Sequence, residues 1–283
     1  MDFTKFFAKI ANRRRSSIIR KWAKAHMTKP NSITLANGLP NAELFPFESI
    51  SVTYKGIPEK KFTGKELSSA LQYGATEGHL PLLQKIREFQ EKWHKPQYDQ
   101  WQLYISSGSQ DGCSKVMEML IDIGDAVMVQ TPAFTGAINA IVPFAPEFIE
   151  IGQDQDGIIP EEIENVCAQR MQDKKPMPKL LYVNPTGANP TGTVLPEDRR
   201  RKVYELAKKY DFLIIEDDPY YFIHFTDKNP TSFFKLDTEG RVIRLDSFSK
   251  FLSAGIRMGV VTGHKELISK LLVHVESSLI HSS

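Results

Sequence analysis

The sequence has little cysteine, little net charge and no long hydrophobic run. Two cysteines, Cys113 and Cys167, are too few for a disulfide framework or a zinc site, and we expect them to pack as small apolar side chains. The 36 basic and 34 acidic residues leave a net charge of +2, which gives no basis for a nucleic-acid or membrane partner. No apolar run approaches the ~18 residues of a membrane-spanning helix. The 283 residues suffice for one large domain or two ordinary ones.

Acidic residues are almost absent from the first forty positions, where Asp2 is the only one. Lysines and arginines instead alternate with an apolar stripe at helical spacing, formed by Phe3, Phe6, Phe7 and Ile10. This pattern is compatible with a mitochondrial transit peptide, and equally with a basic arm that docks on the body or on a second subunit. The compartment is therefore either cytoplasmic or mitochondrial. The spacing predicts helix over residues 1–30, with a second, buried stripe of Ile18, Ile19, Trp22 and Ala23.

The rest of the chain alternates expected strands and helices. An extended segment, Ile33–Pro40, ends in a Gly/Pro-rich loop, and residues 48–72 show no firm pattern. The expected strands are Leu103–Ile105, Ala126–Gln130, Phe148–Ile151, Leu180–Val183, Phe212–Ile215 and Arg241–Leu245. The expected helices are Pro81–Trp93, Asp111–Ile121, Gly136–Val142, Pro160–Met171 and Glu197–Tyr210. This alternation predicts an α/β fold with a doubly wound, largely parallel sheet.

Polar loops follow several of these strands. Ser106–Gln110 joins a strand to a helix through small residues, an arrangement whose free backbone N–H groups can bind phosphate, although a plain capped helix has the same pattern. Phe134 lies just past a strand and either stacks on a flat heteroaromatic ring or packs in the core. The loop Asn184–Gly192 is dense in turn residues. The loop contains the sequence Asn-Pro-Thr-Gly twice, beginning at Asn184 and again at Asn189. The second copy indicates that the loop both forms a turn and presents Asn189.

Three consecutive carboxylates, Glu216, Asp217 and Asp218, follow the apolar strand Phe212–Ile215. Because like charges repel, this run predicts a cation nearby. A metal ion is one possibility, but His224 is the only metal-binding His or Cys close in sequence. The alternative is the protonated nitrogen of a pyridine ring, for which an aspartate partner is typical.

Lys250 lies in the segment Leu245–Arg257, whose flanks are apolar. Desolvation of its charge would lower its pKa, and a neutral amine is a nucleophile toward aldehydes. Ser247, Ser249 and Arg257 are then suitable ligands for a dianion beside it. An aldehyde that carries a phosphate describes pyridoxal 5′-phosphate (PLP). The plainer alternative is that Lys250, like most of the basic residues, is a solvated surface charge.

Four motifs in order resemble those of the class I and II aminotransferases of PLP fold type I: Ser107–Gln110, Asn189–Gly192, Asp217–Tyr220, and Ser247–Lys250 with Arg257. The resemblance extends over essentially the whole chain. The stretch Leu35–Asn41, with Phe45–Phe47, is most similar to the kynurenine/α-aminoadipate aminotransferases, with the fungal aromatic aminotransferases as more distant relatives.

The resemblance implies a role for each matching residue. Lys250 would form the Schiff base with PLP and then carry the proton, Asp217 would hold the pyridine nitrogen protonated, and Tyr220 would bond the ring's 3-oxygen together with Asn189. Phe134 would stack on the ring. The phosphate would be held by Ser109, Gln110, Ser247, Ser249 and Arg257, with Tyr73 contributed by the neighbouring subunit of a homodimer. The substrate side would be lined by Arg20, Gly38, Leu39 and Asn189.

The resemblance also implies a domain plan and an activity. Residues 1–40 would form an N-terminal arm, 41–263 the large PLP-binding domain of a three-layer αβα fold, and 264–283 the start of a C-terminal small domain that is largely missing. An apolar face there, Leu267, Ile268, Leu271, Leu272 and Val275, is expected to lack its partner, and the arginine that clamps the substrate α-carboxylate is not found.

The implied activity moves an amino group from L-kynurenine, L-2-aminoadipate or another aromatic amino acid to 2-oxoglutarate. The alternatives are a cysteine-conjugate β-lyase and a truncated, catalytically impaired chain that binds PLP.

Overall fold

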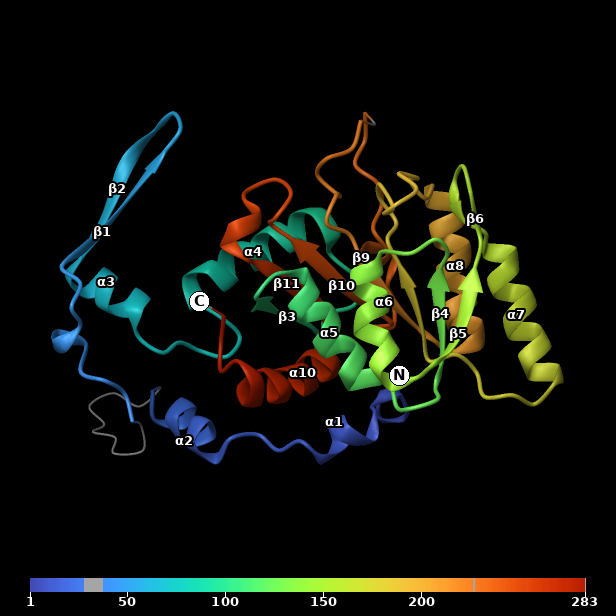
Figure 1. Ribbon diagram of the computed structural model, residues 1–283, viewed down its shortest axis with the longest axis horizontal. Helices are drawn as coiled ribbons and strands as arrows, with labels where there is room; N and C mark the ends of the chain where they lie inside the picture. The colour runs from blue at the N-terminus through green and yellow to red at the C-terminus, as the bar shows by residue number, and fades with distance from the viewer. Residues whose placement is uncertain (28–37, 226, 283) are drawn as a thin grey trace. The chain divides into compact units, whose positions relative to one another are not determined.

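The computed structural model describes residues 1–27, 38–225 and 227–282 of the chain (Figure 1). They form two compact units, one made of Met1–Arg15 with Thr76–Ser283 and the other of Ser16–Ala75. Most of the extended segment expected from Ile33, and the last part of the expected first helix, lie outside the described residues. The expected domain limits at residues 40 and 263 stay a prediction.

A seven-stranded sheet runs through the first unit. Its strands lie in the order β3 (Trp101–Ser106), β11 (Gly259–His264), β10 (Val242–Ser247), β9 (Leu213–Asp217), β8 (Leu180–Val183), β4 (Ala126–Gln130) and β5 (Glu147–Ile151). From β10 to β5 every pairing is parallel, and β11 is antiparallel to both of its neighbours. The expected mostly parallel sheet is confirmed, with β11 as a strand that the sequence reading did not identify.

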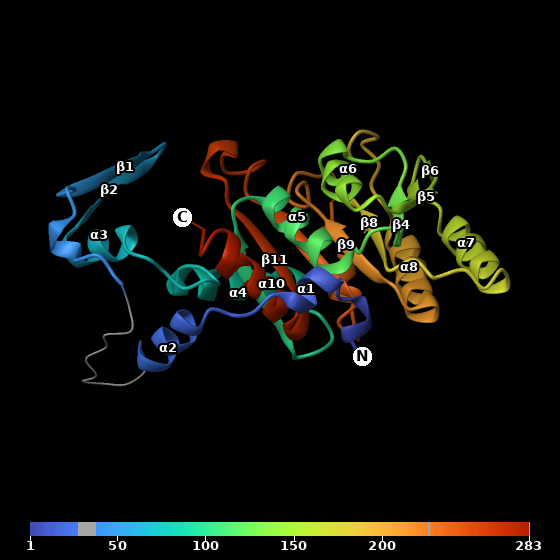
Figure 2. The ribbon, with the colours of Figure 1, turned by 60° about the horizontal axis from the view of Figure 1, so that its bottom comes forward.

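Helices cover both faces of this sheet, so the unit has the three layers expected (Figures 1 and 2). One face carries α1 (Lys9–Arg13), α5 (Ser109–Leu120), α6 (Thr135–Ile141) and α10 (Lys265–Ser278). The other carries α4 (Leu80–His94), α7 (Pro160–Gln172), α8 (Glu197–Tyr210) and α9 (Phe233–Leu236). Shorter elements are η1 (Thr4–Phe6), η3 (Val142–Phe144), η4 (Ala254–Ile256), β6 (Gln153–Asp154) and β7 (Gly157–Ile158).

The strands read as continuous apolar runs because both of their faces are buried. In β4, Val127 and Val129 join the core on the α5 face, while Met128 between them joins the core on the α8 face. Successive side chains of a strand point to opposite faces, so one strand contributes to both cores. Full burial of such a side chain contributes about 1.5–3 kcal/mol. These two cores fix the sheet, and with it the loops at its edge.

Helix α10 packs its apolar face into the first of these cores. Leu267, Ile268 and Leu271 are fully buried beside Met117 of α5, and Val275 is buried with them. The expectation that this face lacks its partner is therefore wrong. The sequence shows that a helix has an apolar face, but the covering element comes from residues more than a hundred positions away.

The N-terminal segment docks on the same side of the first unit. Phe3 and Phe6 are buried in the α5-side core. The backbone N–H of Ala8 donates to the Met119 carbonyl at 2.8 Å, and that of Lys9 donates to an Asp122 carboxylate oxygen at 2.9 Å. The structure thus shows the expected docking on the body, while the transit-peptide interpretation and the compartment stay predictions.

The second unit contains α2 (Ile18–Met27), η2 (Ala42–Leu44), the antiparallel hairpin of β1 (Ser49–Tyr54) and β2 (Ile57–Thr63), and α3 (Gly64–Leu71). Ile18, Ile19 and Trp22 of α2 are exposed, so the expected buried stripe is wrong for these three side chains. The hairpin is almost wholly exposed, which explains the weak sequence pattern over residues 48–72. Within the described residues, no helix combines the length and apolar character needed to cross a membrane.

Candidate functional site

The carboxyl ends of β3, β4, β8, β9 and β10 meet at one edge of the sheet, where the amino end of β11 also lies. In open α/β sheets this is the edge that binds ligands. Four of the sequence-predicted motifs begin there: the loop after β3, the loop after β8, the carboxylates that end β9, and the Ser247–Lys250 segment after β10.

Arg244 of β10 supplies the positive charge for two of the three carboxylates at the carboxyl end of β9, Glu216 and Asp218. The parallel register pairs Arg244 with Glu216, and its Nη1 lies 3.2 Å from the Glu216 carboxylate and 3.1 Å from that of Asp218. Its Nη2 lies 2.8 Å from Asp246. All of these side chains are buried. The expectation of a cation at the three carboxylates is therefore confirmed, but for Glu216 and Asp218 this cation is the guanidinium of Arg244 and not a ligand.

Replacing Arg244 with leucine is expected to destabilise the chain strongly, because Glu216 and Asp218 would be left buried without their main counter-charge. Breaking a buried pair from one side costs about 3–5 kcal/mol. The free energy of unfolding, from denaturant titration, measures this loss. Arg201→Leu is the matched control, since its pair with Glu197 is exposed and its loss should cost about 1 kcal/mol or less. Equal losses in the two variants would contradict this account of Arg244.

Asp217 is the carboxylate that Arg244 does not pair. One oxygen, Oδ2, accepts a 2.6 Å hydrogen bond from the Tyr182 hydroxyl of β8. The other, Oδ1, is buried and has no hydrogen-bond partner among the described residues. Burial raises the pKa of Asp217 to about 6, against the lowering effect of the Tyr182 hydrogen bond. A buried acceptor without a donor is costly, so Oδ1 is suited to a ligand that brings an N–H group, preferably a cationic one.

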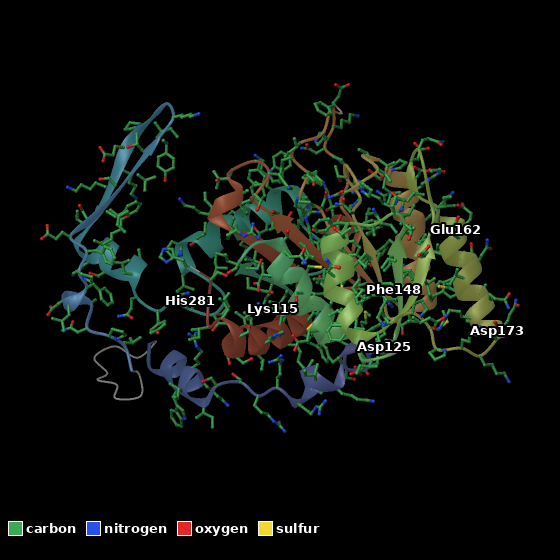
Figure 3. The ribbon with its side chains drawn as sticks, viewed as in Figure 1. Lys115, Asp125, Phe148, Glu162, Asp173 and His281 are labelled. Atoms are coloured by element: carbon green, nitrogen blue, oxygen red, sulfur yellow. The ribbon has the colours of Figure 1, made fainter. Side chains whose placement is uncertain are left out.

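The N-terminus of α5 forms a second part of the edge. Gly108 precedes the helix at φ +87°, and a Cβ on it would lie 2.2 Å from Nη2 of Arg257. Only glycine therefore lets the guanidinium approach the first turn, where the backbone N–H groups of an α-helix have no intrahelical acceptors. Farther along α5, Lys115 (labelled in Figure 3) pairs with Asp111. The helix start and Arg257 together favour an anion.

The hydroxyls of Ser247 and Ser249, in the segment that contains Lys250, lie beside Arg257 at the N-terminus of α5. Arg257 Nη1 donates to Ser249 Oγ at 3.2 Å, and the Ser249 N–H donates to Ser247 Oγ at 3.3 Å. Arg257 makes no ion pair with a carboxylate anywhere in the described part of the chain. Gln110 differs from the prediction in one respect, because its side chain donates to the Gly136 carbonyl at 2.7 Å. The structure thus brings together the residues of this unit that were predicted to bind phosphate. The side-chain amide of Gln110 is the exception, because it binds the first turn of α6.

Lys250 lies on the exposed side of the same edge. Its Nζ is 5.7 Å from the centre of the Tyr220 ring, which confirms that the two motifs meet. The side chain is exposed, so the expectation that apolar flanks desolvate it is wrong. Several of those neighbours, such as Phe251, Leu252 and Ile256, are themselves exposed. An accessible amine beside Tyr220 remains available to a ligand carbonyl.

Asn189 and Phe134 border the site from the β8 and β4 sides. The Asn189 backbone N–H donates to Asn184 Oδ1 at 2.7 Å, and its half-buried side chain makes no hydrogen bond within the described residues. Phe134 is partly buried against the α5-side core and lies over Gly136, where a Cβ would come within 2.5 Å of its ring. Phe134 is therefore a core contact at the edge of the site, and its stacking role stays a prediction.

Four predicted residues belong to the second unit and are described within it. Arg20 lies on α2, with Nη1 3.5 Å from the Gly74 carbonyl. Gly38, Leu39 and Tyr73 are exposed. Their assignment to the substrate and phosphate sites stays a prediction.

Three residues that the sequence reading did not single out contribute to this edge: Tyr182, Asn184 and Arg244. Each is a buried polar residue in or next to a strand of the central sheet. A fully buried polar side chain needs a partner, which is the signal that could have marked them.

The residues of this edge fit pyridoxal phosphate. The buried Oδ1 of Asp217 offers an acceptor for a pyridinium N–H. The N-terminus of α5 after Gly108, together with Arg257, offers charge and hydrogen-bond donors for a phosphate. Lys250 offers an amine for the aldehyde. A metal ion finds no such support, because no cluster of three or more His, Cys, Asp or Glu side chains that could bind one occurs among the described residues.

A layered α/β unit with this constellation at its sheet edge is the design of a PLP-dependent transferase of fold type I. The family model for class I and II aminotransferases matches residues 54–283, and the chain belongs to that family. It is an aminotransferase, of a family whose members use PLP and act on amino acids and 2-oxo acids.

Its relatives include the mitochondrial kynurenine/α-aminoadipate aminotransferases of Rattus norvegicus and Mus musculus. The rat protein is 42% identical over 99% of this chain, and the mouse protein 40% over 100%, with 69% of each relative covered. Among solved structures, the aminotransferase Aro8 of Candida albicans is similar with a TM-score of 0.92 and 30% identity, over 100% of this chain and 68% of that one. A Pyrococcus horikoshii kynurenine aminotransferase is similar with a TM-score of 0.74 and 31% identity, over 99% of this chain and 67% of that one.

Proposed function

We propose that this chain transfers the amino group of L-kynurenine or L-2-aminoadipate to 2-oxoglutarate, with pyridoxal phosphate as the carrier. The observation that carries the proposal is the buried, unpartnered Oδ1 of Asp217 at the edge that also gathers Lys250 and Arg257. The names of the rat and mouse relatives support the two amino-acid substrates.

Asp217 and its neighbours act on the ring. Pyridoxal phosphate, when bound, supplies an electron sink for the bond that breaks at the substrate's α-carbon. Asp217 would hold a proton on the pyridine nitrogen, because its Oδ1 is a buried acceptor and its Oδ2 already accepts from Tyr182. Tyr220 and Asn189 would donate to the ring's 3-oxygen, and Phe134 would lie against the ring face.

The phosphate group would be held where the free N–H groups of α5 begin. Arg257 brings a guanidinium that pairs with no carboxylate among the described residues, and Ser247 and Ser249 bring hydroxyls beside it. Ser109 and Gln110 contribute their backbone N–H groups as the first residues of α5. This combination of dipole, cation and hydroxyls is suited to a dianion.

Lys250 serves as the amine that binds the cofactor aldehyde and as the group that moves a proton at the substrate α-carbon. Because Lys250 is exposed, its Nζ is accessible to both the cofactor aldehyde and the substrate α-carbon. The Tyr220 ring borders Nζ on one side. We further propose that Tyr73 completes the phosphate site of the other subunit in a homodimer, and that Arg20, Gly38, Leu39 and Asn189 line the substrate side.

A donor and product analysis tests the proposal. The purified chain with PLP is given 2-oxoglutarate and one donor at a time: L-kynurenine, L-2-aminoadipate, L-phenylalanine or a cysteine S-conjugate. We expect glutamate to form in a one-to-one ratio with the oxo acid, fastest with the first two donors. Release of pyruvate and ammonia from the cysteine conjugate without glutamate would instead indicate a β-lyase. A cofactor spectrum that no donor changes would indicate a chain that binds PLP without turnover.

A further inference from the structure

The first copy of the repeated motif, Asn184–Gly187, supplies no residue that would touch the cofactor or the substrate in the site proposed above. Its asparagine, Asn184, is nonetheless buried, with 3% of its surface exposed, directly after the end of β8. Its backbone N–H donates to Gln130 Oε1 of β4 at 2.8 Å. Its side-chain Nδ2 donates to the Asp217 carbonyl of β9 at 2.6 Å, and its Oδ1 accepts from the Asn189 N–H at 2.7 Å.

These three hydrogen bonds connect parts of the site that belong to different elements. Asp217 ends β9, whereas Asn189 lies in the loop after β8, and no other hydrogen bond of the described residues links Asn189 to the sheet. A loop residue is ordinarily free to shift relative to the strand beside it. Because Asn184 is buried, loss of its side-chain bonds would leave polar groups unpaired, so the connection is stiff.

We propose that Asn184 is a positioning residue for the transamination reaction, one that sets the position of Asn189 relative to Asp217. The proposal rests on the function proposed above, in which these two residues hold different positions of one rigid pyridine ring. Asn184 itself does not contact the cofactor. A rigid ring requires a fixed spacing between the groups that hold it, and a displacement of about 1 Å is enough to cost roughly a hundredfold in rate.

A purely structural role, in which Asn184 keeps the loop folded, is less suited to the contacts. The loop closes on itself without Asn184: the Ala188 N–H donates to the Thr193 carbonyl and the Leu195 N–H to the Pro185 carbonyl, both at 2.9 Å. Arg200 further donates to the Pro185 carbonyl at 3.0 Å. Loss of the Asn184 side chain should therefore shift the loop relative to β9 rather than unfold it.

The first test needs no cofactor. In Asn184→Ala, the amide hydrogen of Asn189 loses its acceptor, and its exchange with solvent should accelerate at least about tenfold. Asn184→Asp keeps an acceptor oxygen for this amide but loses the donor to the Asp217 carbonyl, so the exchange should slow only in part. Thr191→Ala is the control, because Thr191 is an exposed residue of the same loop. Unchanged exchange at Asn189 in Asn184→Ala would overturn the proposal.

The second test reads the bound cofactor. In the proposed function, Asn189 would donate to the ring's 3-oxygen and so weaken that oxygen's hold on the neighbouring proton. Loss of this bond should therefore raise the midpoint pH of the visible absorption change. We expect an upward shift of about half to one pH unit in Asn184→Ala, in Asn189→Ala, and in the double variant alike, since the first residue acts through the second. Shifts that add in the double variant would overturn the proposal.

The kinetic constants complete the test. Asn184→Ala should lower kcat about 10- to 100-fold, as loss of an outer hydrogen-bonding partner does, while KM for the amino acid changes little. A wild-type chain that does not transaminate refutes the proposed function, whatever the amide exchange shows. A wild-type chain that is active, with Asn184→Ala equal to it in kcat and in midpoint, refutes the positioning role alone.

Discussion

Lys250→Ala is expected to abolish the absorption of covalently bound cofactor and to lower transamination by about four orders of magnitude, the upper end of what a positioned proton-transfer group contributes. The physical reason is that Nζ is the amine that lies beside Tyr220 at the cofactor edge. The fold should persist, because Lys250 is exposed and substitutions at such positions usually change stability by less than about 0.5 kcal/mol. Absorption spectra, steady-state rates and the thermal midpoint measure the three expectations.

Lys202→Ala provides the control for this experiment. Lys202 is an exposed lysine of α8, on the surface away from the site, and its replacement should leave spectrum and rate unchanged. If Lys250→Ala kept the cofactor absorption of the wild-type chain, Lys250 would not be the residue that holds the cofactor.

Asp217→Asn is expected to lower the rate about 10²- to 10³-fold, the loss typical of one preorganised electrostatic contact in an active site. Asparagine has the same shape and can still accept from Tyr182, but its amide places an N–H group where Oδ1 of Asp217 would meet the pyridine N–H. The variant would then offer a pyridine nitrogen no acceptor for a proton. Single-turnover kinetics with L-kynurenine measure the effect on the chemical step alone.

The same substitution should stabilise the cofactor-free chain. Burial raises the pKa of Asp217 to about 6, from an ordinary value of 3.8, so between these values the folded chain holds a proton that the unfolded chain has lost. Stability therefore falls as the pH rises from about 4 to about 6, and it is then constant. Two pKa units at ~1.36 kcal/mol each give a cost of about 3 kcal/mol at pH 8.

Denaturant unfolding of cofactor-free Asp217→Asn and wild-type chains at pH 4 and pH 8 measures this difference. The variant should be more stable by up to about 3 kcal/mol at pH 8 and equal at pH 4. Asp173→Asn is the control, because Asp173 (labelled in Figure 3) is exposed at the end of α7. A stability difference that does not change with pH would contradict the raised pKa of Asp217.

The sequence predicted the layered fold well where its pattern was local. Strands β4 and β8 and helix α8 begin and end at the predicted residues, because continuous apolar runs and a charged amphipathic stretch determine them. It missed β11, whose short run after the Lys250 segment does not distinguish a strand from a helix. The sequence also predicted no partner for the apolar face of α10, because the residues that cover this face are distant in sequence.

In the candidate site, too, residues marked by local sequence patterns could be predicted, whereas residues whose roles depend on distant contacts could not. The motif residues could be found because each carries a distinctive group after a strand. Arg244 and Asn184 could not be placed, because their roles depend on strand register: Arg244 lies beside Glu216 only through the pairing of β9 with β10. The exposure of Lys250 agrees with the plainer alternative and not with the expected desolvation, since apolar neighbours in sequence need not cover a side chain in space.

The most direct test of the cofactor site is to fix the bond between cofactor and protein and then locate it. The wild-type chain is loaded with PLP, reduced with borohydride and digested, and the peptides are mapped by mass spectrometry. We expect one modified peptide, with the phosphopyridoxyl group on Lys250. A group attached to another lysine, or no modified peptide at all, would contradict the central claim that this sheet edge is an aminotransferase cofactor site.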